Sequence, residues 1–118
     1  MATFDHIEVH VSEIKKYCDF LTAIFEGGSY KVISESGTAM FTSADGIHIE
    51  VKKKKDDQVP EMSGFCNPCL RCPNPKALIL GLRLKIESEH DAPFGKVYFF
   101  KDHEGVSWHI KALPEGGI

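Results

Sequence analysis

The sequence lacks any long apolar run and any excess of basic residues. No stretch approaches the roughly 20 apolar residues that cross a membrane as a helix, and no basic segment precedes a short apolar one as in a secretory signal. The 14 Lys and Arg residues stand against 17 Asp and Glu residues, which gives a formal net charge of −3. We therefore expect a cytoplasmic protein that has neither membrane nor nucleic acid as a partner.

Cysteine is scarce, with 4 residues in the chain, and three of them are spaced as Cys66-x-x-Cys69-x-x-Cys72. A chain of 118 residues buries enough apolar surface to fold without disulfides, so reduced thiols are expected. The spacing resembles part of a zinc or iron–sulfur site, but a fourth ligand is missing nearby, and Cys18 falls on the apolar face of a predicted helix. Buried, reduced cysteines are the preferred interpretation.

The first half of the chain predicts a strand, a helix and three further strands. Apolar and polar residues alternate before Ser12, which is a suitable N-cap, and apolar residues then recur at helical spacing until Gly27-Gly28. Alternation returns in three short segments after the glycines. The expected elements are a strand at 4–11, a helix from Ile14 to Phe25, hairpin strands at 30–34 and 38–42, and a strand at 47–52.

The second half repeats this order after a polar stretch that contains Pro60. Its last two strands form a hairpin in which Gly105 supplies a turn conformation that side chains disfavour. The expected elements are an irregular strand at 65–72, a short helix at 75–80, a strand at 82–89, and hairpin strands on either side of the Asp102–Gly105 turn. The organisation is a single domain over 1–118, with a first βαβββ module at 1–55, a linker at 56–63 and a second module at 64–113.

Alternation assigns two faces to each predicted sheet. One face is apolar, and we expect a helix to cover it, burying Ile7, Val9, Leu21, Ile24, Ile49, Val51, Trp108 and Ile110. The other face carries His6, Glu8, His10, His48, Glu50, Lys52, Arg71, Ser107, His109 and Lys111. Imidazoles and carboxylates that converge from several strands are typical of a divalent metal site, whereas the simpler alternative is a face exposed to water.

Three segments, residues 5–11, 46–51 and 94–110, together resemble motifs of the vicinal oxygen chelate superfamily, which includes glyoxalases, bleomycin-resistance proteins and extradiol dioxygenases. The resemblance covers nearly the whole chain. It implies an α+β fold in which two βαβββ modules form a curved mixed sheet around a cleft, with the helices outside. It also implies a homodimer and a small-molecule substrate.

The resemblance further implies a ligand set for a divalent metal ion, either Zn, Ni, Fe or Mn. The ligand positions fall on His6, Glu50, His109 and Asn67, where His109 replaces a more common glutamate and Asn67 a more common histidine. Glu50, His10 and His48 are then the candidates for acid–base chemistry, and Arg71, Tyr98 and Lys111 the candidates for substrate contact.

Three functions remain open at this point. The first is a small glyoxalase-like lyase or isomerase that acts on a molecule with vicinal oxygens through a Lewis-acidic metal. An extradiol-type dioxygenase is a variant of it, because His6, Glu50 and His109 would form a set of two histidines and one carboxylate. The others are a metal-free binding or resistance protein, which the departures at Asn67 and His109 favour, and a catalytically silent interaction domain.

Overall fold

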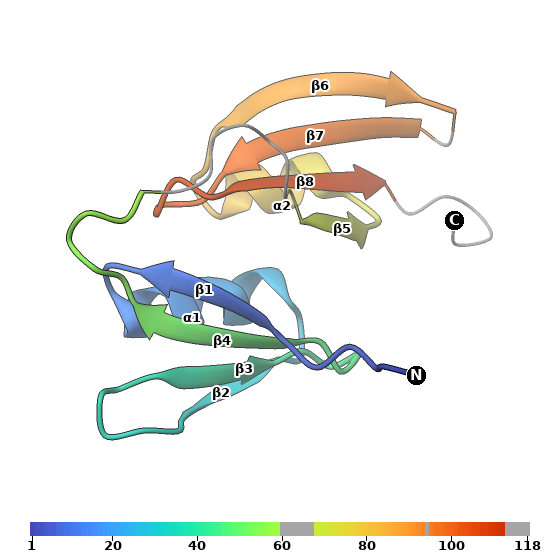
Figure 1. Ribbon diagram of the computed structural model, residues 1–118. Helices are drawn as coiled ribbons and strands as arrows, with labels where there is room; N and C mark the ends of the chain where they lie inside the picture. The colour runs from blue at the N-terminus through green and yellow to red at the C-terminus, as the bar shows by residue number, and fades with distance from the viewer. Residues whose placement is uncertain (60–67, 94, 113–118) are drawn as a thin grey trace. The chain divides into compact units, whose positions relative to one another are not determined.

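The structure, a computed structural model, describes residues 1–59, 68–93 and 95–112 (Figure 1). The chain divides into two compact units, residues 1–58 and 59–118. Among the described residues, no helix has the length and apolar character needed to span a membrane. Each unit contains one helix and a four-stranded mixed sheet, which confirms the predicted α+β class and the two βαβββ modules.

The first unit is a helix packed on a sheet with the strand order β1-β4-β3-β2 (Figure 1). Strand β1 runs parallel to β4, whereas the β4–β3 and β3–β2 pairs are antiparallel. The parallel pair places the first and last strands of the unit side by side, although they are far apart in the sequence. The elements are β1 (Ile7–Val11), α1 (Ile14–Ile24), β2 (Ser29–Val32), β3 (Ala39–Thr42) and β4 (His48–Lys53).

The core of the first unit lies between α1 and strands β2, β3 and β4. The apolar stripe of the helix faces the sheet because its members recur every three or four residues. The fully or nearly fully buried hydrophobic side chains are Val11, Tyr17, Cys18, Leu21, Ile24, Ala39, Phe41, Ile49 and Val51. This burial confirms the predicted apolar faces of β4 and α1, and it leaves the alternate residues of β4 on the opposite face.

Two expectations for the first unit are wrong. Ile7 is 43% exposed rather than buried, because β1 is an edge strand of this sheet and α1 packs mainly on the other three strands. Val9 is half-buried for the same reason. Glu13 rather than Ser12 is the N-cap residue, and its side chain makes no capping hydrogen bond; the helix is held by packing instead.

The second unit repeats this arrangement with the strand order β5-β8-β7-β6 (Figure 1). Strand β5 is parallel to β8, and the other pairs are antiparallel. Helix α2 packs on β6, β7 and β8, and the nearly fully buried side chains include Ile79, Phe100, Trp108 and Ile110. The elements are β5 (Cys69–Cys72), α2 (Pro75–Gly81), β6 (Ile86–Ala92), β7 (Gly95–Lys101) and β8 (Ser107–Ala112).

Strand β6 begins four residues later than the sequence predicts. The amides of Leu82, Arg83 and Leu84 donate to carbonyls of the last turn of α2, and Arg83 has a φ of +60°. These residues therefore close the helix rather than extend the sheet. The strand also ends three residues later than predicted, at Ala92 rather than Glu89, so His90, expected in a loop, lies within it. The part of the predicted strand at 65–67 lies outside the described residues.

The last hairpin of each unit turns in the same way. In β7–β8 the amide of Gly105 donates to the Asp102 carbonyl at 3.0 Å, with Gly105 at a φ of +87°. In β3–β4 the amide of Gly46 donates to the Ser43 carbonyl at 3.0 Å, with Gly46 at a φ of +89°. A positive φ favours glycine at both positions, so the predicted role of Gly105 is confirmed.

The two turns differ in the side chain at their first position. The Asp102 carboxylate is buried and accepts from the Glu104 and Val106 amides at 2.9 and 3.0 Å and from the Trp108 indole at 2.8 Å. The Ser43 hydroxyl accepts only the Ile47 amide, at 2.9 Å, among backbone donors described for that turn. Asp102 thus fixes the start of β8 to the turn and to the core.

Candidate functional site

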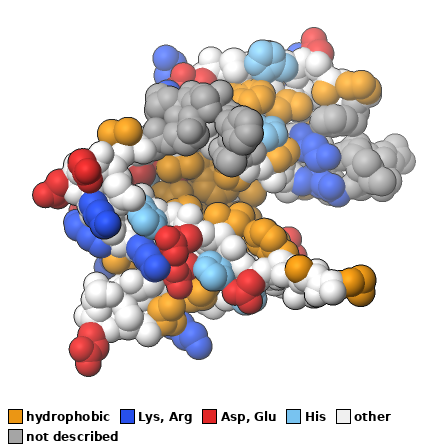
Figure 2. Space-filling view, in the orientation of Figure 1, with side chains coloured by type: hydrophobic (Ala, Val, Ile, Leu, Met, Phe, Trp, Pro, Cys, Tyr) orange, Lys and Arg blue, Asp and Glu red, His pale blue; other side chains and the backbone are white. Residues whose placement is uncertain are grey.

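Two acidic side chains lie opposite each other on the parallel strands β1 and β4. The register pairs Glu8 with Glu50 and His10 with Lys52. Residues paired in this way point to the same face of a sheet, here the face turned away from the helix-packed Ile49 and Val51. Figure 2 shows acidic, basic and histidine side chains gathered over these two strands.

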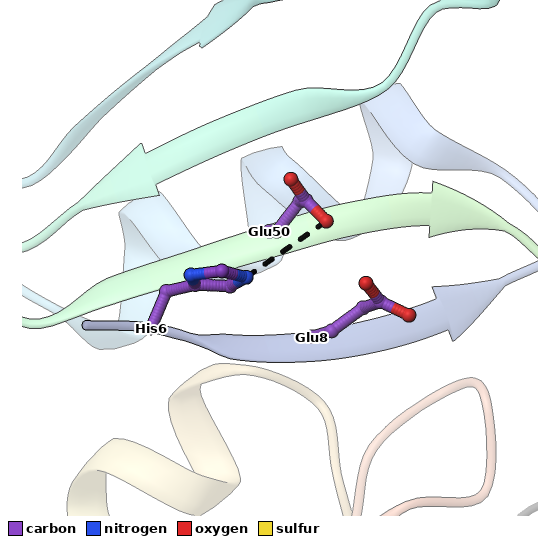
Figure 3. Close-up of side chains that lie close together, drawn as sticks. All are labelled: His6, Glu8 and Glu50. Carbon is purple, nitrogen blue, oxygen red and sulfur yellow. Dashed lines mark ion pairs between the residues drawn. The ribbon is translucent and has the colours of Figure 1, made fainter. Parts of the chain in front are cut away.

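His6 completes a group with Glu8 and Glu50. It directly precedes β1, and its Nε2 lies 4.0 Å from Glu50 Oε1 (Figure 3). One ligand atom from each of the three residues lies within 4.8 Å of the other two. The side chains of His6, Glu8 and Glu50 are 32%, 39% and 15% exposed, so the group is open to solvent while Glu50 is its most buried member.

Lys52 and His10 hold the carboxylates in place. The Lys52 ammonium lies 3.0 Å from Glu8 Oε1 and 3.3 Å from Glu50 Oε1, and His10 Nε2 lies 2.6 Å from Glu8 Oε2. The hydrogen bonds from His10 and Lys52 lower the pKa of the Glu8 carboxyl to about 2. Hydrogen bonds to Glu8 and then to Gln58 raise the pKa of His10, and the bonds to Glu8 and Glu50 raise that of Lys52.

His6 is oriented by its neighbour. Its Nδ1 lies 2.6 Å from Asp5 Oδ2, and this hydrogen bond is the largest cause that raises the pKa of the His6 imidazole. A proton on Nδ1 leaves Nε2, the nitrogen that faces Glu50, with its lone pair available in the neutral ring. A carboxylate bonded to the far nitrogen of a metal-ligating histidine is a common arrangement, because it fixes both the tautomer and the ring orientation.

The donor set fits a divalent cation. One imidazole nitrogen and two carboxylate oxygens from two adjacent strands suit Mn, Fe or Zn, and three protein ligands leave coordination positions for water or a substrate. The Lys52 ammonium lies between the Glu8 and Glu50 carboxylates, which shows that this pair of carboxylates attracts a positive charge.

The other residues predicted in the first unit lie on the same face. His10 is held between Glu8 and Gln58, whose Oε1 lies 3.0 Å from its Nδ1. His48 opens β4 and its Nδ1 lies 3.0 Å from the Thr42 hydroxyl. The structure therefore brings His10 into contact with the acidic group through Glu8, whereas His48 pairs with β3.

The predicted residues of the second unit fall on both faces of its sheet. His109 and Lys111 share a face with their β5 partners Cys69 and Arg71. Tyr98 pairs with the buried Ile110 and so belongs to the opposite, helix-packed face. The structure does not bring Tyr98 together with Lys111, and Asn67 lies outside the described residues. The roles of His109, Asn67, Arg71, Tyr98 and Lys111 stay predictions.

A shallow pocket of about 470 Å³ lies on the His109 face of the second unit. Cys69, His90, Val97, Phe99, His109 and Lys111 line it. His109 stacks on Phe99, with ring centroids 4.9 Å apart, and partial burial lowers the pKa of its imidazole. The neutral ring that results is able to accept a proton or a hydrogen bond near pH 7.

The cysteines divide into two kinds. Cys18 is fully buried in the first unit, as expected, and burial raises the pKa of its thiol to about 11. The preference for buried cysteines is wrong for Cys69, which is exposed at the pocket. Cys66 lies outside the described residues, and within the described chain Cys69 and Cys72 join no group of three metal ligands.

Sequence reasoning missed three contributors. Glu8 was placed on the right face but not assigned as a ligand, although its position two residues after His6 put both side chains on one side of β1. His90 was missed because β6 extends to Ala92, past the predicted end of the strand at Glu89. Phe99 was interpreted only as part of an aromatic run, since nothing in the sequence indicates that its ring contacts the imidazoles of His90 and His109.

No protein-family model matches the sequence, and no curated protein sequence matches it. Several solved structures match the fold of the chain. A mutant of the fosfomycin resistance protein FosX from Listeria monocytogenes, complexed with Mn(II) and 1S,2S-dihydroxypropylphosphonic acid, has a TM-score of 0.74 at 19% identity, with 95% of this chain and 92% of that chain covered.

Two further structures show the same likeness. A glyoxylase/bleomycin resistance protein/dioxygenase domain from Frankia sp. EAN1pec has a TM-score of 0.70 at 11% identity, with 93% of this chain and 96% of that one covered. A member of the Glyoxalase/bleomycin resistance protein/dioxygenase superfamily from Sphaerobacter thermophilus DSM 20745 has a TM-score of 0.68 at 12% identity, with 95% and 98% covered. The chain therefore has the fold of this superfamily, as its motifs predicted.

Proposed function

We propose that this chain, which has the vicinal oxygen chelate fold, is a metal-dependent enzyme that acts on a small molecule with vicinal oxygens. The observation that carries the proposal is the group formed by His6, Glu8 and Glu50 on the helix-free face of the first unit. Fold likeness alone would not support it, since one fold hosts many functions. The donors in this group are those that a divalent cation requires.

Each residue of the group has a distinct task in this proposal. His6 and Glu50 hold the cation from two strands, and Glu8 adds a second negative charge. A cation held there would supply Lewis-acid polarisation of the substrate oxygens. His10, bonded to Glu8, and His48 are the candidates for moving a proton, and His109 and Asn67 are proposed as further ligands from the sequence motifs.

The donor set favours manganese and a lyase or isomerase type of reaction. Two carboxylates and one imidazole form an oxygen-rich set of the kind that suits Mn²⁺. The likeness to FosX structures that contain Mn(II) supports the same choice. An extradiol-type dioxygenase is the variant that would need two histidines and one carboxylate, and hence His109 as a ligand in place of Glu8.

The test is a calorimetric titration of chelator-treated protein with Mn²⁺. The same titration is then repeated with Zn²⁺ and with Ni²⁺. One site per chain is expected. His6→Ala and Glu50→Gln should each weaken binding at least tenfold, because each removes one donor of three. Matched controls are His103→Ala, at an exposed position of the β7–β8 turn, and Glu89→Gln on β6, where the native carboxylate pairs with Lys96 of β7; neither should change the affinity.

A metal-free binding protein is the second candidate, because one observation favours it. Lys52 lies within ion-pair distance of both Glu8 and Glu50, so the two carboxylates are already compensated by a protein cation. If the parent binds no divalent metal, or if His6→Ala and Glu50→Gln leave binding unchanged, this second function replaces the first.

The remaining proposals concern assembly and location. The superfamily fold supports a homodimer, and analytical ultracentrifugation should give twice the monomer mass of 13.2 kDa. The balanced charge supports a small molecule rather than nucleic acid as the partner, and a cytoplasmic location is proposed from the composition. We also propose that residues 1–118 behave as one folding domain, which predicts a single unfolding transition.

A further inference from the structure

Gln58 ends a tight turn that begins at Lys55, two residues after the end of β4 at Lys53. The backbone amide of Gln58 donates to the Lys55 carbonyl at 3.0 Å, and its side-chain Oε1 accepts the Lys55 amide at 2.7 Å. The segment is joined to β1 as well, because the Lys54 amide donates to the Val11 carbonyl at 2.8 Å. These hydrogen bonds hold the carboxamide of Gln58 in a defined orientation.

The same oxygen accepts a second hydrogen bond, from a histidine of the candidate site. Gln58 Oε1 lies 3.0 Å from His10 Nδ1. A backbone amide only donates, so the carboxamide atom that faces the Lys55 amide is the oxygen and not the nitrogen. An amide oxygen only accepts, and His10 Nδ1 is therefore the donor in this contact.

The other nitrogen of the His10 ring is bonded too. Its Nε2 lies 2.6 Å from Glu8 Oε2, with a proton between the two atoms. Neither nitrogen of His10 therefore directs a lone pair at a substrate or a metal ion. His48, on the same face, differs, because its Nδ1 lies 3.0 Å from the Thr42 hydroxyl, which can donate or accept and so does not fix the tautomer of the ring.

From these contacts we propose that Gln58 is a positioning residue, which fixes the His10 ring so that His10 acts on the site only through Glu8. The ring cannot turn over without losing both of its hydrogen bonds. His10 then orients a carboxylate of the group, as the outer partners of metal ligands do, and direct proton exchange with a substrate is left to His48. This consequence for the reaction rests on the proposed function, whereas the hydrogen bonds themselves form without a metal.

The test is an NMR measurement of the exchange of the His10 ring N–H protons with water, made on the full chain in the presence of a chelator. In the parent, the Nδ1–H proton should be observed at neutral pH, because its hydrogen bond to Gln58 slows exchange. Gln58→Met keeps the length of the side chain but removes the acceptor, and it should speed this exchange about fivefold to tenfold. Gln58→Glu keeps an acceptor oxygen and should retain the slow exchange of the parent.

Two controls separate positioning from a general loosening of the turn. Asp57→Ala changes the exposed neighbour of Gln58 in the same turn, and it should leave the exchange at His10 unaltered. Carbethoxylation by diethyl pyrocarbonate, mapped by mass spectrometry, gives a chemical readout, since the reagent requires a ring nitrogen with an available lone pair. Gln58→Met should raise the rate at His10 about fivefold and leave the rate at His48 unchanged.

An Nδ1–H proton of His10 that exchanges too fast to be observed in the parent, or that exchanges equally in the parent and Gln58→Met, would overturn the proposal. Mn²⁺ titration of the parent distinguishes this failure from failure of the proposed function. If the parent binds no Mn²⁺ but the Gln58 variants behave as expected, the metal-dependent function is wrong and Gln58 still positions His10. If Mn²⁺ binds and Gln58→Met changes neither exchange nor carbethoxylation at His10, the function stands and the role proposed for Gln58 is wrong.

Discussion

The two units of this protein share one backbone plan but carry opposite chemistry on the same face of the sheet. In the first unit, Glu50 on β4 pairs with Glu8 on the parallel strand β1. In the second, the residue at the equivalent place in β8, His109, pairs with Cys69 on β5. Two residues further along the strands, Lys52 pairs with His10, whereas Lys111 pairs with Arg71.

This difference shows which positions the fold constrains and which it leaves free. The helix-packed positions are apolar in both units, with Ile49 and Val51 in one and Trp108 and Ile110 in the other. The positions between them lie on the opposite face from the helix, so their side chains can vary without loss of the fold. One unit uses this freedom to gather carboxylates on this face, and the other gathers aromatic and imidazole rings there.

The largest expected effect compares the two hairpin turns. Asp102→Ala should lower the free energy of unfolding by about 3 kcal/mol, because it leaves the Trp108 indole and two backbone amides without their buried acceptor. Ser43→Ala, at the equivalent place in the first unit, should cost about 1 kcal/mol, since it removes one backbone contact. Urea unfolding measures both, and equal losses would show that the two turns are held alike.

A second experiment asks whether the acidic pair is specific to the first unit. Glu8→Gln should weaken Mn²⁺ binding about tenfold, because it removes one of two negative charges while keeping the shape of the side chain. The matched change Cys69→Ser, at the parallel position of the second unit, should leave it unaltered. Mn²⁺ calorimetry on both variants decides this, and an unchanged affinity for Glu8→Gln would remove Glu8 from the ligand set.

Lys52 provides a smaller effect of opposite sign. Because its ammonium lies between Glu8 and Glu50, it competes with a metal cation for the same charges. Lys52→Met should therefore tighten Mn²⁺ binding about threefold to tenfold, whereas Lys53→Met, next along the strand on the other face, should not. Weaker binding in Lys52→Met would mean instead that the lysine positions the carboxylates for the metal.

Thiol reactivity gives a further contrast between the units. Iodoacetamide should modify the exposed Cys69 at least tenfold faster than Cys18, which is buried and whose thiol has a pKa raised to about 11 by burial. Peptide mapping by mass spectrometry under native conditions measures both rates. Comparable rates for the two thiols would show that the first unit opens often enough to expose Cys18 as much as Cys69.

The smallest effect is a dependence of stability on acid that both units share. Asp19 bonded to Lys15 and Tyr30, and Asp91 bonded to Lys96, each have a carboxyl pKa below the ordinary value of 3.8. Their stabilisation is present above the unfolded pKa and is lost as the pH falls through the folded one, that is, from about pH 4 downward. Asp19→Asn and Asp91→Asn should each slightly flatten the fall in melting temperature over that range, and salt should reduce the difference.

The sequence by itself determined the two modules, the faces of their strands and the hairpin at Gly105. These features depend on local rules: strand side chains alternate, helix contacts recur every three or four residues, and a positive φ favours glycine. His6 and Glu50 could be placed on one face for the same reason. Where a second local rule competed, as at Leu82–Leu84, where the helix end took the backbone hydrogen bonds, the predicted boundary was wrong.

Only the tertiary structure decided which side chains meet. Strand register is set by hydrogen bonds between segments far apart in the chain, and alternation within one strand does not specify it. That register brought Glu8 opposite Glu50, and Cys69 beside His109. The packing of the helix left Ile7 exposed on an edge strand, because burial depends on where the helix packs and not on the apolar character of one residue.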